Sequence, residues 1–198
     1  MPTVIEIGPY HSIDPNNWGE NYSERRSLGR IESEIAESRF RSFTFSFETH
    51  LMRTRKLFQD ASQLRILDSG CGEGSSVFGF VQLGRKLGIP IAITAITMDP
   101  RHKSMLIRHA DEVVIGTTEH FFEIKERRNY YHFILDYQGA LGSDNADKII
   151  PIYGRILVSG GSALLTWPYL DQTRKFPFEE NGLVLECGGK GRGHFLKS

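Results

Sequence analysis

The stretch of sequence that decides the fold is Leu67-Asp68-Ser69-Gly70-Cys71-Gly72-Glu73-Gly74-Ser75. It follows a β-rich run that begins at Leu64, and it leads into a segment whose apolar residues repeat with a helical period. Alternate glycines let a ligand approach the backbone closely, because they carry no Cβ, and they accept the turn conformations that join a strand to a helix. The stretch therefore predicts a ligand-binding loop at the end of a strand, with a plain strand-to-helix turn as the alternative.

The acid at Asp68 indicates which kind of ligand this loop binds. A dinucleotide loop has the pattern G-x-G-x-x-G, which seats a pyrophosphate on the N–H groups at the start of a helix. Here Ser75 stands three positions after Gly72, and Asp68 would repel a pyrophosphate. A carboxylate at this place suits a positively charged group such as an α-ammonium, so the loop is predicted to bind a cationic ligand.

Around this loop the chain alternates β-rich runs with amphipathic segments, which is typical of βαβ units and a parallel sheet. Strands are predicted at residues 64–68, 91–98, 113–115, 130–135 and 155–158, the last ending at Gly160-Gly161. Helices are predicted at residues 21–40, 46–60, from about Val77 to Gly88, after Pro100, and at 144–150. Residues 183–185 and 194–196 are expected to form an antiparallel hairpin on one sheet edge. The fold class expected is α/β: a doubly wound, mostly parallel seven-stranded sheet with an antiparallel C-terminal edge hairpin and helices on both faces.

A change of composition near residue 62 divides the chain. Residues 1–61 are predicted to be an N-terminal arm, irregular over the first twenty residues and then helical, that covers the ligand or shapes an acceptor pocket. Residues 62–198 are predicted to be the binding domain. Tyr10, Trp18 and Tyr22 either contact an acceptor ring or pack the arm onto the domain.

Charge and cysteine content exclude several classes of protein. Lysine and arginine total 24 and aspartate and glutamate total 24, so the balance lacks the basic excess of a dedicated nucleic-acid binder. Two cysteines provide neither a disulfide framework nor a structural zinc site. We see no signal peptide and no apolar run of membrane-spanning length, and we expect a cytoplasmic protein without membrane contact.

The glycine stretch resembles the first motif of class I (Rossmann-like) S-adenosylmethionine-dependent methyltransferases, [D/E]-x-G-x-G-x-G, which stands here as Asp68, Gly70, Gly72 and Gly74. The resemblance implies S-adenosyl-L-methionine as cofactor. In the family an acid at the end of the second strand binds the ribose hydroxyls, and Asp99 stands there. Asp99 before a proline is also a typical helix cap, and both interpretations stay open.

The resemblance continues along the later strands. The family often has a Gly-Asp pair after the third strand, near the adenine amino group, and Thr117 replaces that acid. After the fourth strand, at Asp136 and Tyr137, the family places residues that face the methyl donor and the acceptor. The cofactor-binding residues that the resemblance implies are Asp68, Ser69, Gly70, Cys71, Gly72, Gly74, Asp99, Pro100, Thr117, Thr118 and Asp136.

The reaction implied is transfer of a methyl group to an unidentified acceptor, a small molecule or a protein side chain. Alignment of donor and acceptor carries much of such a reaction, and a general base is needed only when the acceptor must lose a proton. Asp136, Tyr137 and His11 are candidates for that base. Asp136 with Asp144 and Asn145 is a possible metal cluster, but these residues are more typical of a solvated turn, and we expect no metal.

Nucleic acid is disfavoured as the acceptor. The fourth strand lacks the [D/N/S]-P-P-[Y/F] motif of amine methylases, and neither Cys71 nor Cys187 fits a cytosine-C5 nucleophile. Two other functions stay open: a non-catalytic S-adenosylmethionine-binding or interaction module, which the replaced acid at Thr117 favours, and an NAD(P)-dependent oxidoreductase, which Asp68 opposes.

Overall fold

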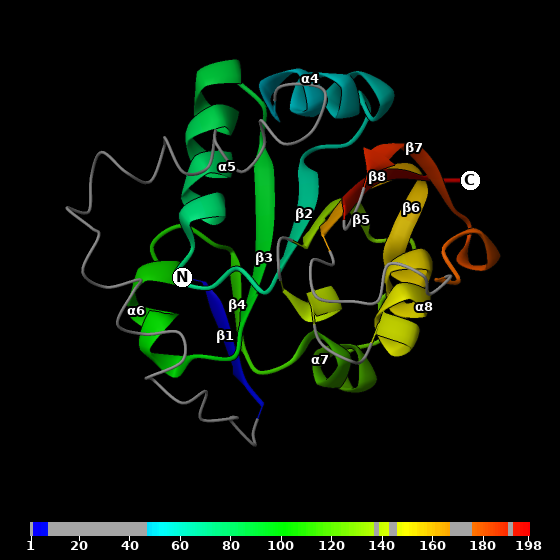
Figure 1. Cartoon of the computed structure of the whole chain (residues 1–198). Helices are drawn as coiled ribbons and strands as arrows, with labels where there is room; N and C mark the ends of the chain where they lie inside the picture. The colour runs from blue at the N-terminus through cyan, green and yellow to red at the C-terminus, as the bar shows by residue number, and fades with distance from the viewer. Residues whose placement is uncertain (1, 8–46, 137–138, 143–145, 167–175, 190–191) are drawn as a thin grey trace.

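One sheet organises the molecule, and its strands lie in the order β1-β4-β3-β2-β5-β6-β8-β7 (Figure 1). The computed structural model describes residues 2–7, 47–136, 139–142, 146–166, 176–189 and 192–198. The strands are β1 (Thr3–Glu6), β2 (Leu64–Ser69), β3 (Ile91–Thr97), β4 (Glu112–Ile115), β5 (Tyr131–Asp136), β6 (Leu157–Thr166), β7 (Leu183–Gly189) and β8 (Arg192–Lys197). Strands β1 to β6 pair in parallel, whereas β8 is antiparallel to both β6 and β7.

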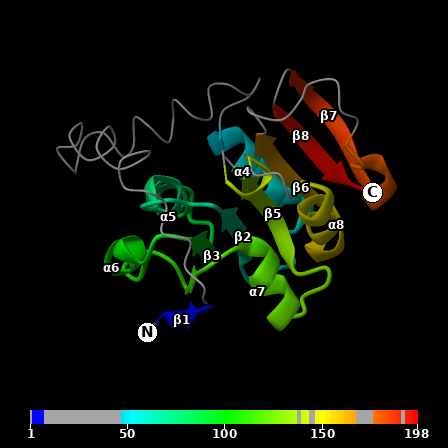
Figure 2. The same ribbon diagram turned by 60° about the horizontal axis from the view of Figure 1, so that its bottom comes forward.

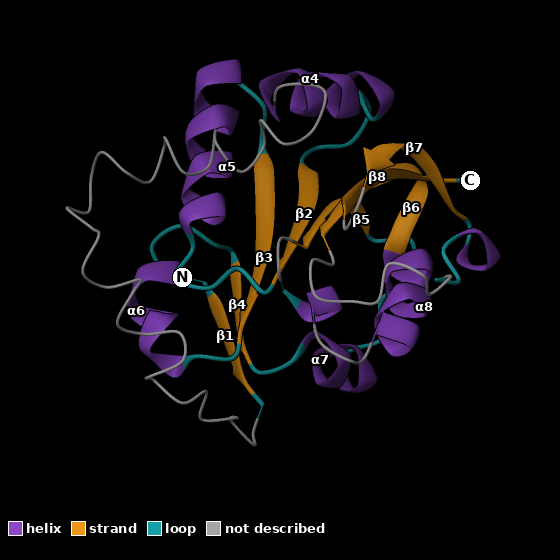
Figure 3. Cartoon of the chain, in the orientation of Figure 1, coloured by secondary structure: helices purple, strands orange, loops and turns teal. Residues whose placement is uncertain are grey.

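Helices cover both faces of this sheet (Figures 2 and 3). They are α4 (Phe47–Leu57), α5 (Ser75–Leu87), α6 (Lys103–Leu106), α7 (Thr118–Ile124) and α8 (Ala146–Ile156), with short 3-10 turns at Pro100–His102, Ala140–Gly142 and Glu179–Asn181. Successive strand residues point to opposite faces, so Phe133 packs with α4 and α5 whereas Ile134 packs with α7 and α8. The strands are apolar on both faces because both faces are covered.

The chain winds outward from the centre of the sheet in two directions. It passes from β2 to β3 and β4 on one side, then returns to place β5 beside β2 and continues to β6 on the other. In such sheets ligands bind outside the carboxyl ends of the strands, where the order reverses. This switch point lies between the ends of β2 and β5, and the doubly wound α/β class predicted from the sequence is confirmed.

Over the described residues the sheet has eight strands, one more than the seven that the sequence predicted. Residues 1–20 were predicted to be irregular, yet Thr3–Glu6 forms β1, which pairs in parallel with β4 at the sheet edge. The strand is only four residues long and lies between Pro2 and Gly8, which are typical of turns. Its β-branched residues Val4 and Ile5 are too few to indicate a strand by themselves. The predicted helix at 21–40 lies outside the described residues.

The second correction concerns the strand predicted at 155–158. Arg155 and Ile156 instead end α8, which continues through Pro151, and β6 runs past the two glycines to Thr166. A short apolar run does not distinguish a buried helix from a strand. The pairing of β6 with β5 is interrupted after Leu157 and resumes at Ser162, so the glycines form an irregularity within the strand rather than its end.

Candidate functional site

The three glycines after β2 differ in what surrounds them. A Cβ on Gly70 would overlap the Cα atom of Gly139, so the carboxyl ends of β2 and β5 meet backbone to backbone. A Cβ on Gly74, which precedes α5, would lie 2.6 Å from the Leu106 side chain of α6. Gly72 has a φ of +57°, and none of the described residues has an atom within 4 Å of its Cβ position. Gly70 and Gly74 therefore serve packing, and Gly72 is where a ligand can approach the backbone.

Asp68 lies beneath this loop, and its side chain is buried. Its carboxylate accepts a hydrogen bond from the Ser76 hydroxyl in the first turn of α5. The Cys71 thiol is also buried, and burial together with the nearby Asp68 charge raises the pKa of that thiol. The negative charge of Asp68 is thus held inside the protein, next to the start of the helix.

A buried hydrogen-bond network joins the strand ends at the switch point. The Tyr153 hydroxyl of α8 lies 2.6 Å from Oδ2 of Asp136 and 2.7 Å from Oγ of Ser69. The Ser69 hydroxyl in turn lies 2.6 Å from Oγ1 of Thr118, at the start of α7. The side chains of Ser69, Thr118 and Asp136, all implied as cofactor ligands, therefore point into the protein.

The Asp136 carboxylate also fixes the loop after β5, which is described over residues 139–142. Its Oδ1 accepts the Gly139 N–H at 2.8 Å, and its Oδ2 accepts the Leu141 N–H at 2.9 Å. Asp136 is 0% exposed, and burial raises its pKa to about 6 although these hydrogen bonds act in the opposite direction. A carboxylate held in this way is a structural anchor for the loop.

Asp99 and Thr117 lie at the ends of β3 and β4, and each caps a helical turn. Oδ1 of Asp99 accepts the Arg101 N–H at 2.9 Å, which shows the capping role that the sequence left open. The Arg101 side chain donates to both oxygens of Asp99 and lowers the pKa of that carboxyl. Oγ1 of Thr117 accepts the His120 N–H at 3.2 Å. Pro100 follows Asp99 as the exposed first residue of its turn.

Some of the residues that the sequence predicted for the site fall outside the described part of the chain. His11, Tyr137, Asp144 and Asn145 lie outside the described residues. In the part of the chain that the structure describes, no group of His, Cys, Asp or Glu side chains is arranged to hold a metal ion. Likewise, none of the described helices is long and apolar enough to cross a membrane.

Sequence reasoning missed Ser76 and Tyr153, and it placed Gly139 after the fourth strand without predicting its backbone contact with Gly70. The only signal for Gly139 is a glycine shortly after the end of a strand. Tyr153 belongs to the buried stripe of α8 with Ile149 and Ile152, and so it is indistinguishable from core in the sequence.

No family model matches the chain, and no curated protein matches it in sequence. The solved structures that are similar in fold include three that match this chain at TM-scores of 0.50 to 0.51. They are a TehB-like S-adenosylmethionine-dependent methyltransferase from Corynebacterium glutamicum (18% identity, 85% of this chain and 99% of that chain, TM-score 0.50), a putative sarcosine dimethylglycine methyltransferase from Galdieria sulphuraria (21%, 70% and 60%, 0.50), and the CMeT domain of the citrinin polyketide synthase (16%, 69% and 47%, 0.51). The chain thus spans about half to three fifths of the last two structures. These likenesses show that it has the class I methyltransferase fold, as the glycine motif predicted.

Proposed function

We propose that this chain binds S-adenosylmethionine at the carboxyl edge of β2 and β5 and transfers its methyl group to a small molecule or a protein side chain. The observation that carries the proposal is Gly72, the open glycine of a D-x-G-x-G-x-G loop at the switch point of a methyltransferase fold. A ligand can approach the backbone at this position, because of the three motif glycines only Gly72 has no atom of the described residues within 4 Å of its Cβ position.

The charges around the loop suit a donor with an α-ammonium group. The buried Asp68 gives the loop a negative field, which favours a cation and opposes a pyrophosphate. Asp99 stands at the end of the neighbouring strand β3, where a carboxylate can accept ribose hydroxyls. The Arg101 guanidinium donates to both of its oxygens, so a ribose at this position would replace those hydrogen bonds.

In the proposed reaction the protein mainly binds the methyl donor and orients it toward the acceptor. S-adenosylmethionine supplies a methyl group that its sulfonium already activates. The chain would fix the donor on the backbone of the loop and exclude water, and alignment of this kind lowers barriers by about 7–11 kcal/mol in well-oriented systems. The internal hydrogen bonds of Asp136 disfavour it as the base, which leaves Tyr137 and His11 as candidates.

The acceptor class is proposed from two kinds of support. The chain lacks the motifs of nucleic-acid methylases, and the polyketide synthase domain and the putative sarcosine dimethylglycine enzyme have names that refer to small molecules. A second candidate function is a binding module without turnover. The buried carboxylate of Asp136 favours it, because a residue placed to face donor and acceptor is used to hold the loop instead.

Calorimetry followed by turnover tests both functions. The whole chain is titrated with S-adenosylhomocysteine and, separately, with NAD, and we expect heat of binding only from the first. Cell extract and donor labelled in the methyl group then report transfer and the acceptor together. Binding of NAD without binding of S-adenosylhomocysteine would contradict the proposal, and binding of S-adenosylhomocysteine without any labelled product would favour the non-catalytic module.

A further inference from the structure

A single side chain from outside the loop region joins the two sides of the proposed site. Tyr153 comes from α8, which lies beside β5 and β6 (Figure 1), and it is 0% exposed. Its hydroxyl contacts Ser69 at the end of β2 and Asp136 at the end of β5. The glycine motif contributes a backbone contact between these strand ends, whereas Tyr153 contributes hydrogen bonds from a side chain. The tyrosine hydroxyl therefore links the two strand ends where the backbones of Gly70 and Gly139 meet.

We propose that Tyr153 is a positioning residue that holds the loop after β5 against the loop after β2, and so sets the shape of the site around Gly72. This inference rests on the proposed function in that the ligand used to detect it is S-adenosylhomocysteine. The placement of the loop itself does not depend on which ligand binds.

Tyr153 acts on the loop after β5 through the Asp136 carboxylate, which also accepts hydrogen bonds from two backbone amides of that loop. Oδ2 of Asp136 accepts both the Tyr153 O–H and the Leu141 N–H, while Oδ1 accepts the Gly139 N–H. The ionised carboxylate can accept all three donors. A protonated carboxyl has no net charge and gives up one acceptor position to its own proton, so the hydrogen bonds that it accepts from these donors are weaker. The loop after β5 is therefore held best when Asp136 is ionised.

Tyr153 helps to keep Asp136 ionised. Burial favours the neutral form of Asp136, and the hydrogen bond from Tyr153 is the largest influence in the other direction. The titratable groups near the Tyr153 hydroxyl are Asp136 on β5 and Asp68 on β2. Burial raises the pKa of the Tyr153 phenol, and the charges of these two carboxylates raise it further. Ser69 and Thr118 complete the surroundings and are uncharged. Removing the hydroxyl would raise the pKa of Asp136 above about 6, toward neutral pH.

Tyr153→Phe tests the proposal, with Tyr131→Phe as the matched control. Tyr131 is 1% exposed, belongs to the same core cluster, and donates to Oγ1 of Thr94, but it is the first residue of β5, at the opposite end of the sheet. Both variants lose one buried hydroxyl, so we expect a similar fall in melting temperature. Only Tyr153→Phe should bind S-adenosylhomocysteine more weakly, by about tenfold, the loss expected for one hydrogen bond to a charged group.

Two further readouts separate positioning from simple loss of stability. In the wild type the affinity for S-adenosylhomocysteine should fall as the pH drops through about 6, where Asp136 takes up a proton. In Tyr153→Phe the midpoint of this fall should move to higher pH, and in Tyr131→Phe it should not. Hydrogen exchange at the Gly139 and Leu141 amides should be faster in Tyr153→Phe than in Tyr131→Phe, with or without ligand.

The outcomes can be told apart. Unchanged affinity, pH midpoint and amide exchange in a folded Tyr153→Phe variant would overturn the inference, as would an equal loss of affinity in Tyr131→Phe. A wild type that does not bind S-adenosylhomocysteine refutes the proposed function, and amide exchange then decides the positioning role alone. If Tyr153→Phe does not fold, Ser69→Ala cuts the bridge at β2. It should weaken binding without moving the pH midpoint, and unchanged binding would overturn the inference.

Discussion

At the scale of the residue, Gly72 is the position where the candidate site makes its most direct prediction. Gly72 and Gly88 both have left-handed φ values, +57° and +65°, and a Cβ at either position meets no atom of the described residues within 4 Å. Asparagine tolerates this conformation better than other side chains do. Gly72→Asn should therefore fold and should bind S-adenosylhomocysteine at least about tenfold more weakly, which corresponds to about 1.4 kcal/mol. Calorimetry measures the affinity.

The control for this prediction is Gly88→Asn. Gly88 ends α5 at the opposite edge of the sheet from the glycine loop, so its substitution carries a similar backbone cost without touching the site. Equal affinities in Gly72→Asn, Gly88→Asn and the wild type would show that the open side of the loop is not where the ligand lies.

Single residues also show the limit of inference from the sequence. The motif indicated Gly72 as a ligand contact, because an acid followed by alternate glycines at a strand end is a specific pattern for a loop that binds through its backbone. The resemblance after the fourth strand also implied that Asp136 faces the ligand, whereas the structure shows a carboxylate that accepts three internal hydrogen bonds. The donor from Tyr153 depends on how α8 packs onto the sheet, and no spacing along the chain encodes that packing.

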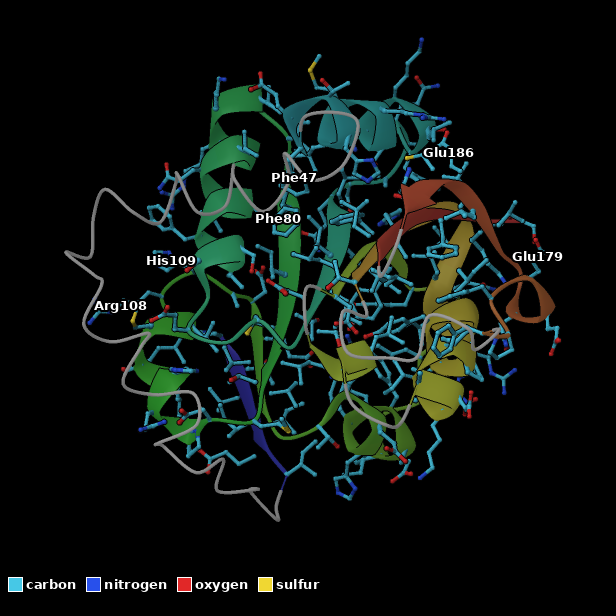
Figure 4. All side chains as sticks on the ribbon, in the orientation of Figure 1. Phe47, Phe80, Arg108, His109, Glu179 and Glu186 are labelled. Carbon is cyan, nitrogen blue, oxygen red and sulfur yellow. The ribbon has the colours of Figure 1, made fainter. Side chains whose placement is uncertain are left out.

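At the scale of the element, α4 is held on the sheet by a narrow buried stripe. Phe47 packs against Phe80 of α5, and both are labelled in Figure 4. Their ring centroids lie 4.2 Å apart, and Leu51 follows Phe47 one turn later. Leu51 is 1% exposed, whereas its neighbour Met52 is 54% exposed. Leu51→Ala should lower the free energy of unfolding by about 2–5 kcal/mol, because it leaves a cavity between α4 and the sheet.

Met52→Ala is the control on the same helix, and it should change the free energy of unfolding by less than about 0.5 kcal/mol. Denaturant melts of both variants measure the difference. Similar losses would mean that α4 is not anchored by the stripe that the structure shows.

Elements with strong periodicity or clear end signals were predictable. The stripe of α4, the glycine that ends α5, and the apolar run of β3 each matched the structure closely. Elements whose signal is short or mixed were not. An apolar run such as Ile156-Leu157-Val158 is compatible with both a buried helix and a strand. The helix α8 extends to Ile156 because Tyr153 and Ile156 both pack in the core beside the sheet.

At the scale of the whole molecule, a pair of buried histidines makes stability depend on pH. His50 of α4 and His194 of β8 come from distant parts of the chain, and their rings lie 4.9 Å apart edge to face. Nε2 of His50 lies 2.9 Å from the Ser162 hydroxyl, and Nδ1 of His194 lies 2.7 Å from Oε2 of Glu186. Figure 4 labels Glu186 beside α4. Burial, with the nearby His194 and Arg53, lowers the pKa of His50 to about 3.

The sign of the effect follows from this lowered pKa. Above pH 6.5 His50 is neutral in both the folded and the unfolded chain, and as the pH falls below 6.5 the unfolded chain takes up a proton that the folded chain does not. Between pH 7 and pH 5 this should remove about 2 kcal/mol of stability. His50→Gln should lose correspondingly less over the same interval, as measured by denaturant melts at each pH.

Two comparisons isolate the contribution of His50. Asp136 acts in the opposite direction, because its raised pKa costs stability at neutral pH and that cost falls on acidification, but it is present in both proteins and cancels in the difference. His120→Gln removes a partly exposed imidazole on α7 and serves as the matched control. If His50→Gln and the wild type lose equal stability, the pair does not govern the response to acid.

The placement of β8 has a consequence for the order in which the protein can be assembled as it is synthesised. β8 follows β7 in the chain but lies between β6 and β7, with hydrogen bonds to both. Until Arg192–Lys197 has left the ribosome, β6 has an unpaired edge on that side, and His50 has no His194 to pack against. Translation proceeds at about 5–20 residues per second, and exposed strand edges promote aggregation. A nascent chain that stalls before β8 would therefore present the edge of β6 to its neighbours, although the glycine loop and β5 are already in place.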